Sequence, residues 1–314
     1  MEAGDAFKPQ SQGGRNMNKR VALTGVSVAV GSLLMIGSAY AGLGDAPGYD
    51  AYKSAVKQTF AVQNVTKQMN VTVKDNGTKL LDVQSTVKED KAKNEMSAAI
   101  NLNGGAASQG INLYRQDGKQ IVKASDNDVY NVIEGKQWKG KAGEHRGQAP
   151  DGISAEVENV VDALVGNLKD YVTLSPQADG TKNISMQLSG SQIPAVANAI
   201  GSLVVKQAAN AEGHHKGVQE PFGDKLQGLQ DSMPKLTQDV KIDKFDLAAQ
   251  VNADNRIEKQ QMTLTISGKD AQGVSHEVVV AADFGLSNFN GTTADHVDLS
   301  GKQVKTLDVK KHGE

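Results

Sequence analysis

Residues 64–87 of the chain, NVTKQMNVTVKDNGTKLLDVQSTV, decide its fold. Apolar and polar side chains alternate on both sides of the Asp-Asn-Gly triplet at 75–77, which is typical of two strands that each bury one face. Asn-Gly between alternating segments is a strong hairpin signal, because both residues tolerate a positive φ. This stretch therefore predicts an antiparallel hairpin with one apolar face.

The same period of two recurs through most of the chain. Short turns with glycine, asparagine or aspartate separate the alternating segments, as expected for strands that pair in sequence order. Beyond the first hairpin, we expect strands near 96–102, 111–113, 121–124, 128–133, 182–189, 240–252, 256–268 and 275–286.

Three other segments have the helical period of about 3.6 residues. They are 49–60, 154–171 and 191–209. The first places Tyr52, Val56 and Phe60 on one face, and each of the other two begins with a serine that can cap its first turn. Helices and strands mixed in one unit indicate an α+β fold. We expect a single domain over 42–288 and a polar C-terminal tail over 289–314 that frays.

The segment 17–41 predicts export. A short basic stretch that includes Lys19 and Arg20 precedes an apolar run at 21–37, and the segment ends in an A-x-A pattern at Ala41. We expect translation to start at Met17, with 1–16 as extra residues, and cleavage after Ala41. The protein would then be secreted or extracytoplasmic, at the exterior of the cell envelope. The alternative, an uncleaved anchor, needs about 20 mainly apolar residues.

Composition excludes several classes of function. The 314-residue chain has no cysteine and a formal net charge of −2. Disulfides, thiolate metal sites, thiol catalysis and lipid attachment to cysteine are therefore ruled out. A charge near zero gives no general attraction to nucleic acid, so we expect no nucleic-acid partner. Because no nucleotide-binding, G-x-S-x-G or H-E-x-x-H motif occurs, we expect no cofactor, no bound metal and no enzymatic activity.

The order of the elements resembles the lipoprotein-localisation-factor family (LolA and LolB), together with lipid-binding lipoproteins of the LppX type. The resemblance is carried by the opening helix at 49–60, the meander over 64–133, the helix-strand-helix run over 154–209 and the long strands over 240–286. It implies a strongly curved antiparallel sheet, an incomplete barrel, covered by two or three amphipathic helices. It also implies an extracytoplasmic binder of a lipid, acyl chain or lipoprotein. The chain lacks the lipidated cysteine of many members.

An apolar hollow on such a sheet would be lined by the inward side chains of several strands. We expect it to draw on Ile100, Leu102, Ile111, Leu113, Met186, Leu188, Met262, Leu264, Ile266, Val278 and Val280. The same residues fit a filled core equally well, because alternation fixes which face they share and not how tightly that face is packed.

A second candidate is a surface contact. Trp138 is the only tryptophan and stands in a glycine- and lysine-rich loop beside Lys136 and Lys139. An exposed aromatic ring among lysines can contact anionic lipid or polymer. A solvated loop with no partner is the simpler alternative.

The remaining polar clusters predict no site. They are His214 and His215 with Glu212 and Glu220, His276 and His296 with Asp295 and Asp298, the turn at 126–128 and the turn at 75–77. Adjacent histidines in a loop point apart, no third catalytic group is evident, and neither turn has the ligand spacing of a calcium loop.

Two functions remain. The first is an exported, non-enzymatic protein that binds a lipid, acyl chain or lipoprotein in the apolar hollow. The alternative is an extracytoplasmic sensor, or a module that binds a cell-envelope protein or polymer, with a filled core and no small-molecule ligand.

Overall fold

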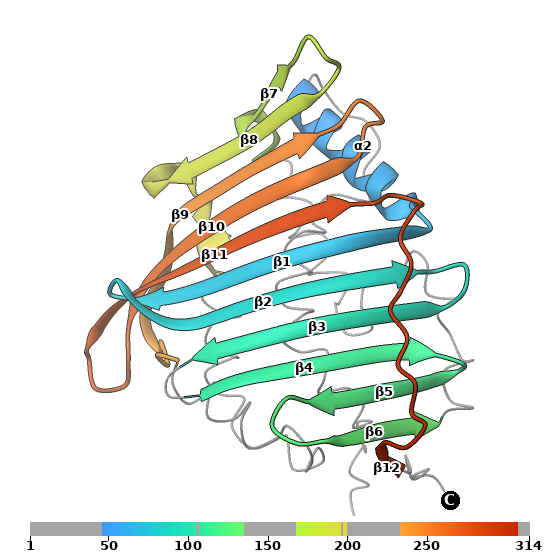
Figure 1. Cartoon of the computed structure of the whole chain (residues 1–314). Helices are drawn as coiled ribbons and strands as arrows, with labels where there is room; N and C mark the ends of the chain where they lie inside the picture. The colour runs from blue at the N-terminus through green and yellow to red at the C-terminus, as the bar shows by residue number, and fades with distance from the viewer. Residues whose placement is uncertain (1–45, 105–106, 135–167, 196, 200–232, 307–314) are drawn as a thin grey trace, which may run out of the picture.

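The computed structural model of the chain describes residues 46–104, 107–134, 168–195, 197–199 and 233–306. These residues form one 12-stranded sheet with a single helix of more than one turn beside it (Figure 1). The helix is α2 (Pro47–Ala61). The strands are β1 (Asn64–Asp75), β2 (Thr78–Asp90), β3 (Glu95–Gly104), β4 (Ala107–Gln116), β5 (Lys119–Ala124), β6 (Val129–Glu134), β7 (Val172–Pro176), β8 (Lys182–Ser189), β9 (Gln238–Val251), β10 (Ile257–Lys269), β11 (Ser275–Ser287) and β12 (Gln303–Thr306).

The strands lie in the order β12-β6-β5-β4-β3-β2-β1-β11-β10-β9-β8-β7. Every neighbouring pair is antiparallel except β12 with β6, which is parallel. The predicted meander is confirmed as β1–β6, and the predicted long strands are β9–β11. Because β11 pairs with β1, the sheet joins the two halves of the sequence along its middle.

The hairpin predicted over 64–87 forms as expected. β1 and β2 pair from Asn64 opposite Asp90 to Asp75 opposite Thr78. Their turn holds Asn76 at φ 47° and Gly77 at φ 81°. Two consecutive residues with positive φ match the twist of antiparallel strands, which explains why Asn-Gly stands there.

The sheet is open and is not strongly curled. β12 and β7 are its two ends and do not pair with each other. Register shifts, which bend strands, occur only within the β1/β2 and β9/β10 pairs of the described sheet. The prediction of an antiparallel sheet is confirmed, but the strong curvature of an incomplete barrel is wrong, and the described residues are mostly β rather than α+β.

Helix α2 is the described part of the predicted helical cover. It packs against the end of the sheet formed by β7, β8, β9 and β10, where Ala55 is 0% exposed. Tyr52 and Val56 also pack there, as predicted. Phe60 does not: it is 51% exposed and is not part of that cluster.

Most of the two other predicted helices, 154–171 and 191–209, lies outside the described residues. The described end of the first helix differs from the prediction, whereas the second segment is helical at 195 and 197–199. Lys169–Tyr171 is a 3-10 turn, and the chain then enters β7, which was not predicted. Pairing of Val172 with Met186 and of Leu174 with Ile184 overrides the helical pattern there. Ser191 lies in a second 3-10 turn, and the helical residues after it include Asn198.

The C-terminal tail does not fray over its first part. Residues 288–302 run along one end of strands β1–β6 before β12 joins the sheet (Figure 1). We call this segment the strap. Thr292 Oγ1 lies 2.9 Å from Thr66 Oγ1, and Asp295 accepts from Lys88 Nζ at 2.7 Å. Gln116 donates to the carbonyl of Val297 at 2.9 Å, so polar side chains hold the strap in place.

Candidate functional site

The register of the strands places all eleven predicted lining residues on one face of the sheet. Directly paired residues share a face, and every second residue along a strand returns to it. Leu102 is opposite Val83, which in turn is opposite Val71. The same level continues through Ala282 and Met262 to Leu247 and Met186. We call this side the apolar face.

The eleven residues differ in how deeply they are buried. Leu102, Ile111, Leu188, Met262 and Ile266 are buried. Ile100, Leu113, Met186, Leu264, Val278 and Val280 are half-buried. A continuous cluster of buried side chains runs over β1–β5 and β11, and Met233 packs against it. The apolar face is therefore a broad surface on which six of these eleven side chains are only partly covered.

At the other end of the apolar face, α2 is fixed by polar contacts as well as by packing. Tyr52 donates from its hydroxyl to Gln260 Oε1 at 3.0 Å, and Gln260 is buried. Burial raises the pKa of Tyr52 to about 12, so the hydroxyl stays protonated and keeps its donor role. Thr59 accepts from the backbone N–H of Ile257 at 2.8 Å, which ties the last turn of α2 to the start of β10.

A histidine and two carboxylates lie where β11 begins. His276 Nδ1 is 2.8 Å from Asp75 Oδ2, and its Nε2 is 3.5 Å from Asp270 Oδ2. The hydrogen bond with Asp75 raises the pKa of His276 above its usual value, against the opposing effect of burial. These contacts join the β1–β2 turn to the β10–β11 turn. We call this group the histidine clasp.

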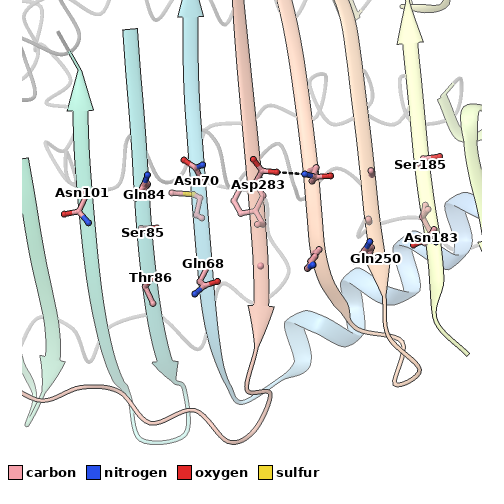
Figure 2. Close-up of a pocket in the computed structure, with 18 of the residues that line it drawn as sticks. Gln68, Asn70, Gln84, Ser85, Thr86, Asn101, Asn183, Ser185, Gln250 and Asp283 are labelled. Carbon is pink, nitrogen blue, oxygen red and sulfur yellow. Dashed lines mark hydrogen bonds between the residues drawn. The ribbon is translucent and has the colours of Figure 1, made fainter. Parts of the chain in front are cut away.

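The opposite side of the sheet, the polar face, carries an open hollow of about 810 Å³. None of the eleven predicted lining residues borders it. The residues of this face that do are mostly amides and small side chains: Gln68, Asn70, Gln84, Thr86, Ala99, Asn101, Asn183, Ser185, Ala248, Gln250, Lys259, Gln261, Asp283 and Gly285. Figure 2 shows the labelled members spread over strands from β3 to β8.

Few of these amides are engaged within the protein. Gln261 donates to Asp283 at 2.6 Å, and Gln84 donates to Asp82 at 3.2 Å. The described residues provide no hydrogen bond to the side chains of Gln68, Asn70, Asn101, Asn183 and Gln250, all of which are exposed. Donors and acceptors of these side chains are therefore available to a ligand.

Sequence reasoning missed this hollow, because an alternating strand was interpreted only through its apolar side. A signal was present: two amides stand two residues apart in β1, at Gln68 and Asn70, and Gln84 follows on the partner strand. Polar residues at strand spacing indicate a solvent-facing side, but only the register shows that amides of six strands meet.

The other candidates from the sequence do not converge on a site. Trp138, Lys136, Lys139, His214 and His215 lie outside the described residues. His276 contacts the clasp carboxylates, whereas His296 lies 3.3 Å from Glu95, so the two histidines are apart. In the turn at 126–128, Asn127 accepts from the N–H of Val129 at 3.0 Å, which is a hairpin contact.

Across the ranges that the structure describes, no group of three or more histidine, aspartate or glutamate side chains is arranged to hold a metal ion. In that part of the chain, no helix is both long enough and apolar enough to cross a membrane.

No family model matches the chain, and no curated protein matches it. Among solved structures, the chain is similar to the ywiB protein from Bacillus subtilis, with 6% identity over 72% of this chain and 92% of that one, at a TM-score of 0.15. It is also similar to a beta-barrel-like protein of domain of unknown function DUF1849 from Brucella abortus, with 9% identity over 72% of this chain and 100% of that one, at a TM-score of 0.18.

Proposed function

We propose that this is an exported, non-enzymatic protein that binds a lipid, an acyl chain or a lipid-modified protein against the apolar face of its sheet. The observation that carries the proposal is the placement of six large half-buried side chains on that one face. They are Ile100, Leu113, Met186, Leu264, Val278 and Val280. The resemblance in element order to lipoprotein-localisation factors agrees with such a ligand.

An acyl chain suits this surface physically. Burying a methylene group contributes about 0.8 kcal/mol, so a chain laid along half-buried valine and leucine side chains gains affinity without any polar anchor. Methionine side chains adapt to irregular ligands, and Met186 and Met262 lie at one level of the apolar face. The ligand would lie on the surface of an open sheet rather than in the deep hollow that the resemblance implies.

The polar groups of the described chain support a binding role rather than catalysis. The clasp uses its histidine to join two turns, Lys88 pairs with Asp295 in the strap, and Lys67 pairs with Glu89 at 2.6 Å. Each pair connects strands or holds the strap, and none faces a nucleophile with an orienting third group.

Native mass spectrometry of the purified protein tests the proposal. We expect a co-purified lipid mass on the wild-type chain and uptake of a fluorescent apolar probe after delipidation. Leu264→Arg should abolish both, because a guanidinium on the apolar face cannot be desolvated cheaply. Leu264 is half-buried, and circular dichroism will show that the variant keeps its strands.

The matched control is Thr263→Arg, the neighbouring residue on the polar face of the same strand, opposite Ala281. This variant should keep the lipid and the probe. A folded wild-type protein with a bare mass and no probe uptake would overturn the proposal in favour of a sensor or polymer-binding module with a filled core.

A further inference from the structure

The polar face arranges its side chains in two rows that run across the strands. In the first row, Asn101, Gln84, Asn70, Asp283 and Gln261 are successive register partners on β3, β2, β1, β11 and β10. In the second row, Thr86, Gln68, Gly285, Lys259, Gln250 and Asn183 are successive partners from β2 to β8. The rows are two residues apart along each strand, and the hollow lies over them (Figure 2).

The floor of the hollow is formed by small residues. Ala99, Ala248 and Gly285 stand among the amides on this face and lower the surface between them. A Cβ at Gly285 would make an ordinary van der Waals contact with the side chain of Gln68 at 3.7 Å, so a small side chain fits there without a clash. A chain-like ligand can therefore approach the sheet closely while longer side chains flank it on two sides.

We propose that this hollow binds a neutral polysaccharide laid across the strands. A carboxamide both donates and accepts, as does each sugar hydroxyl, so the two chemistries pair without needing any charge. Lys259 and Asp283 are the two charged groups that border the hollow, and their charges cancel. Neighbouring strands are about 4.8 Å apart, so amides recur at a regular step to which a repeating ligand can match its hydroxyls.

The same lining argues against a peptide or an anionic polymer. Peptides bind through aromatic, arginine or aliphatic anchors that fill pockets. The residues of the polar face that border the hollow include no aromatic side chain and no leucine, isoleucine or valine. Met69, Ile184 and Phe284 also border the hollow, but the register assigns them to the apolar face. A polyanion requires several cations, and this border supplies only Lys259. Binding would be wet and weak per sugar, and would gain strength from the number of sugars engaged.

Affinity electrophoresis through gels containing dextran or hydroxyethylcellulose tests the proposal. We expect retardation of the wild-type protein by at least one of these neutral glucans, unchanged at high salt because no net charge is involved. The double variant Gln68→Ala/Asn70→Ala removes one amide from each row and should weaken binding roughly tenfold. Gly285→Leu should also weaken it, by filling the floor of the hollow.

Gln187→Ala is the matched control, since Gln187 is an exposed amide on the polar face, opposite Asp246 and outside the hollow. It should leave retardation unchanged. The proposal is overturned if neither glucan retards the wild-type protein. It is also overturned if retardation occurs only in gels that contain alginate, an anionic polysaccharide, and disappears at high salt. A third contrary result would be a loss of retardation in Gln187→Ala as large as that in the double variant. Both faces can be tested on the same preparation. A failure to bind glucan leaves the lipid proposal standing, and a failure to bind lipid leaves the polysaccharide proposal standing.

Discussion

Two adjacent residues of β8 show how differently the two faces of the sheet are built. Ile184 is 1% exposed beneath α2, whereas Asn183 on the other face is exposed at the border of the hollow. The same strand thus contributes stability through one side chain and an available amide through the next. The sheet therefore packs a core on one side while it presents available polar groups on the other.

The largest loss of stability is expected from a substitution on the buried face. Ile184→Ala removes three methyl or methylene groups from the cluster under α2 and should lower the free energy of unfolding by about 2–5 kcal/mol. Asn183→Ala should change it by less than about 0.5 kcal/mol, because that side chain is exposed. Urea denaturation of both variants measures the difference. Equal losses would mean that the two faces are not energetically distinct.

Two glycines, one in α2 and one in the hollow of the polar face, should differ in how well they tolerate a larger side chain. A Cβ at Gly48, in the first turn of α2, would overlap the carbonyl oxygen of Val172 in β7. Gly48→Ala should therefore cost about 1–3 kcal/mol by forcing the helix away from the sheet. Gly285→Ala, in the open hollow, should be neutral within about 0.5 kcal/mol. Thermal unfolding gives the answer, and a tolerated Gly48→Ala would show that α2 can shift without loss.

A smaller effect comes from the hydrogen bond beneath the helix. Tyr52→Phe leaves Gln260 without its donor while keeping the ring in place. We expect a loss of about 1–2 kcal/mol, since a buried amide oxygen loses its partner. The tyrosine absorbance in an alkaline titration provides an independent check, because the titration step near pH 12 should disappear with this residue. No change in stability would mean that water replaces the hydroxyl.

The smallest expected effect concerns pH. Because the pKa of His276 is raised in the folded state, its contribution is complete below the usual histidine value of about 6.5 and is lost as pH rises through the raised pKa. Urea midpoints should therefore fall modestly on the alkaline side of that window. In His276→Asn this decline should vanish. A wild-type profile that stays flat above neutral pH would contradict the role of the clasp.

The sequence predicted which side chains share the apolar face, because alternation within each strand is local and survives any arrangement of the strands. It did not predict that β11 lies beside β1, since the alternation within a strand does not specify which distant strand pairs with it. β7 was missed because five residues after a helical pattern are outweighed by that pattern. The hollow was missed because its amides come from strands far apart in the chain, as Asn101 and Asn183 illustrate.

The pairing of β12 with β6, directly after the strap, has a consequence for the chain during its synthesis. Strand β6 is bordered on its outer side by β12, which is synthesised after every other strand of the sheet. Until residues 303–306 emerge, the backbone groups of β6 on that side have no strand partner and can pair with another chain. Completion of the polypeptide therefore also removes a template for aggregation, and a chain that is cut before β12 would keep that edge open.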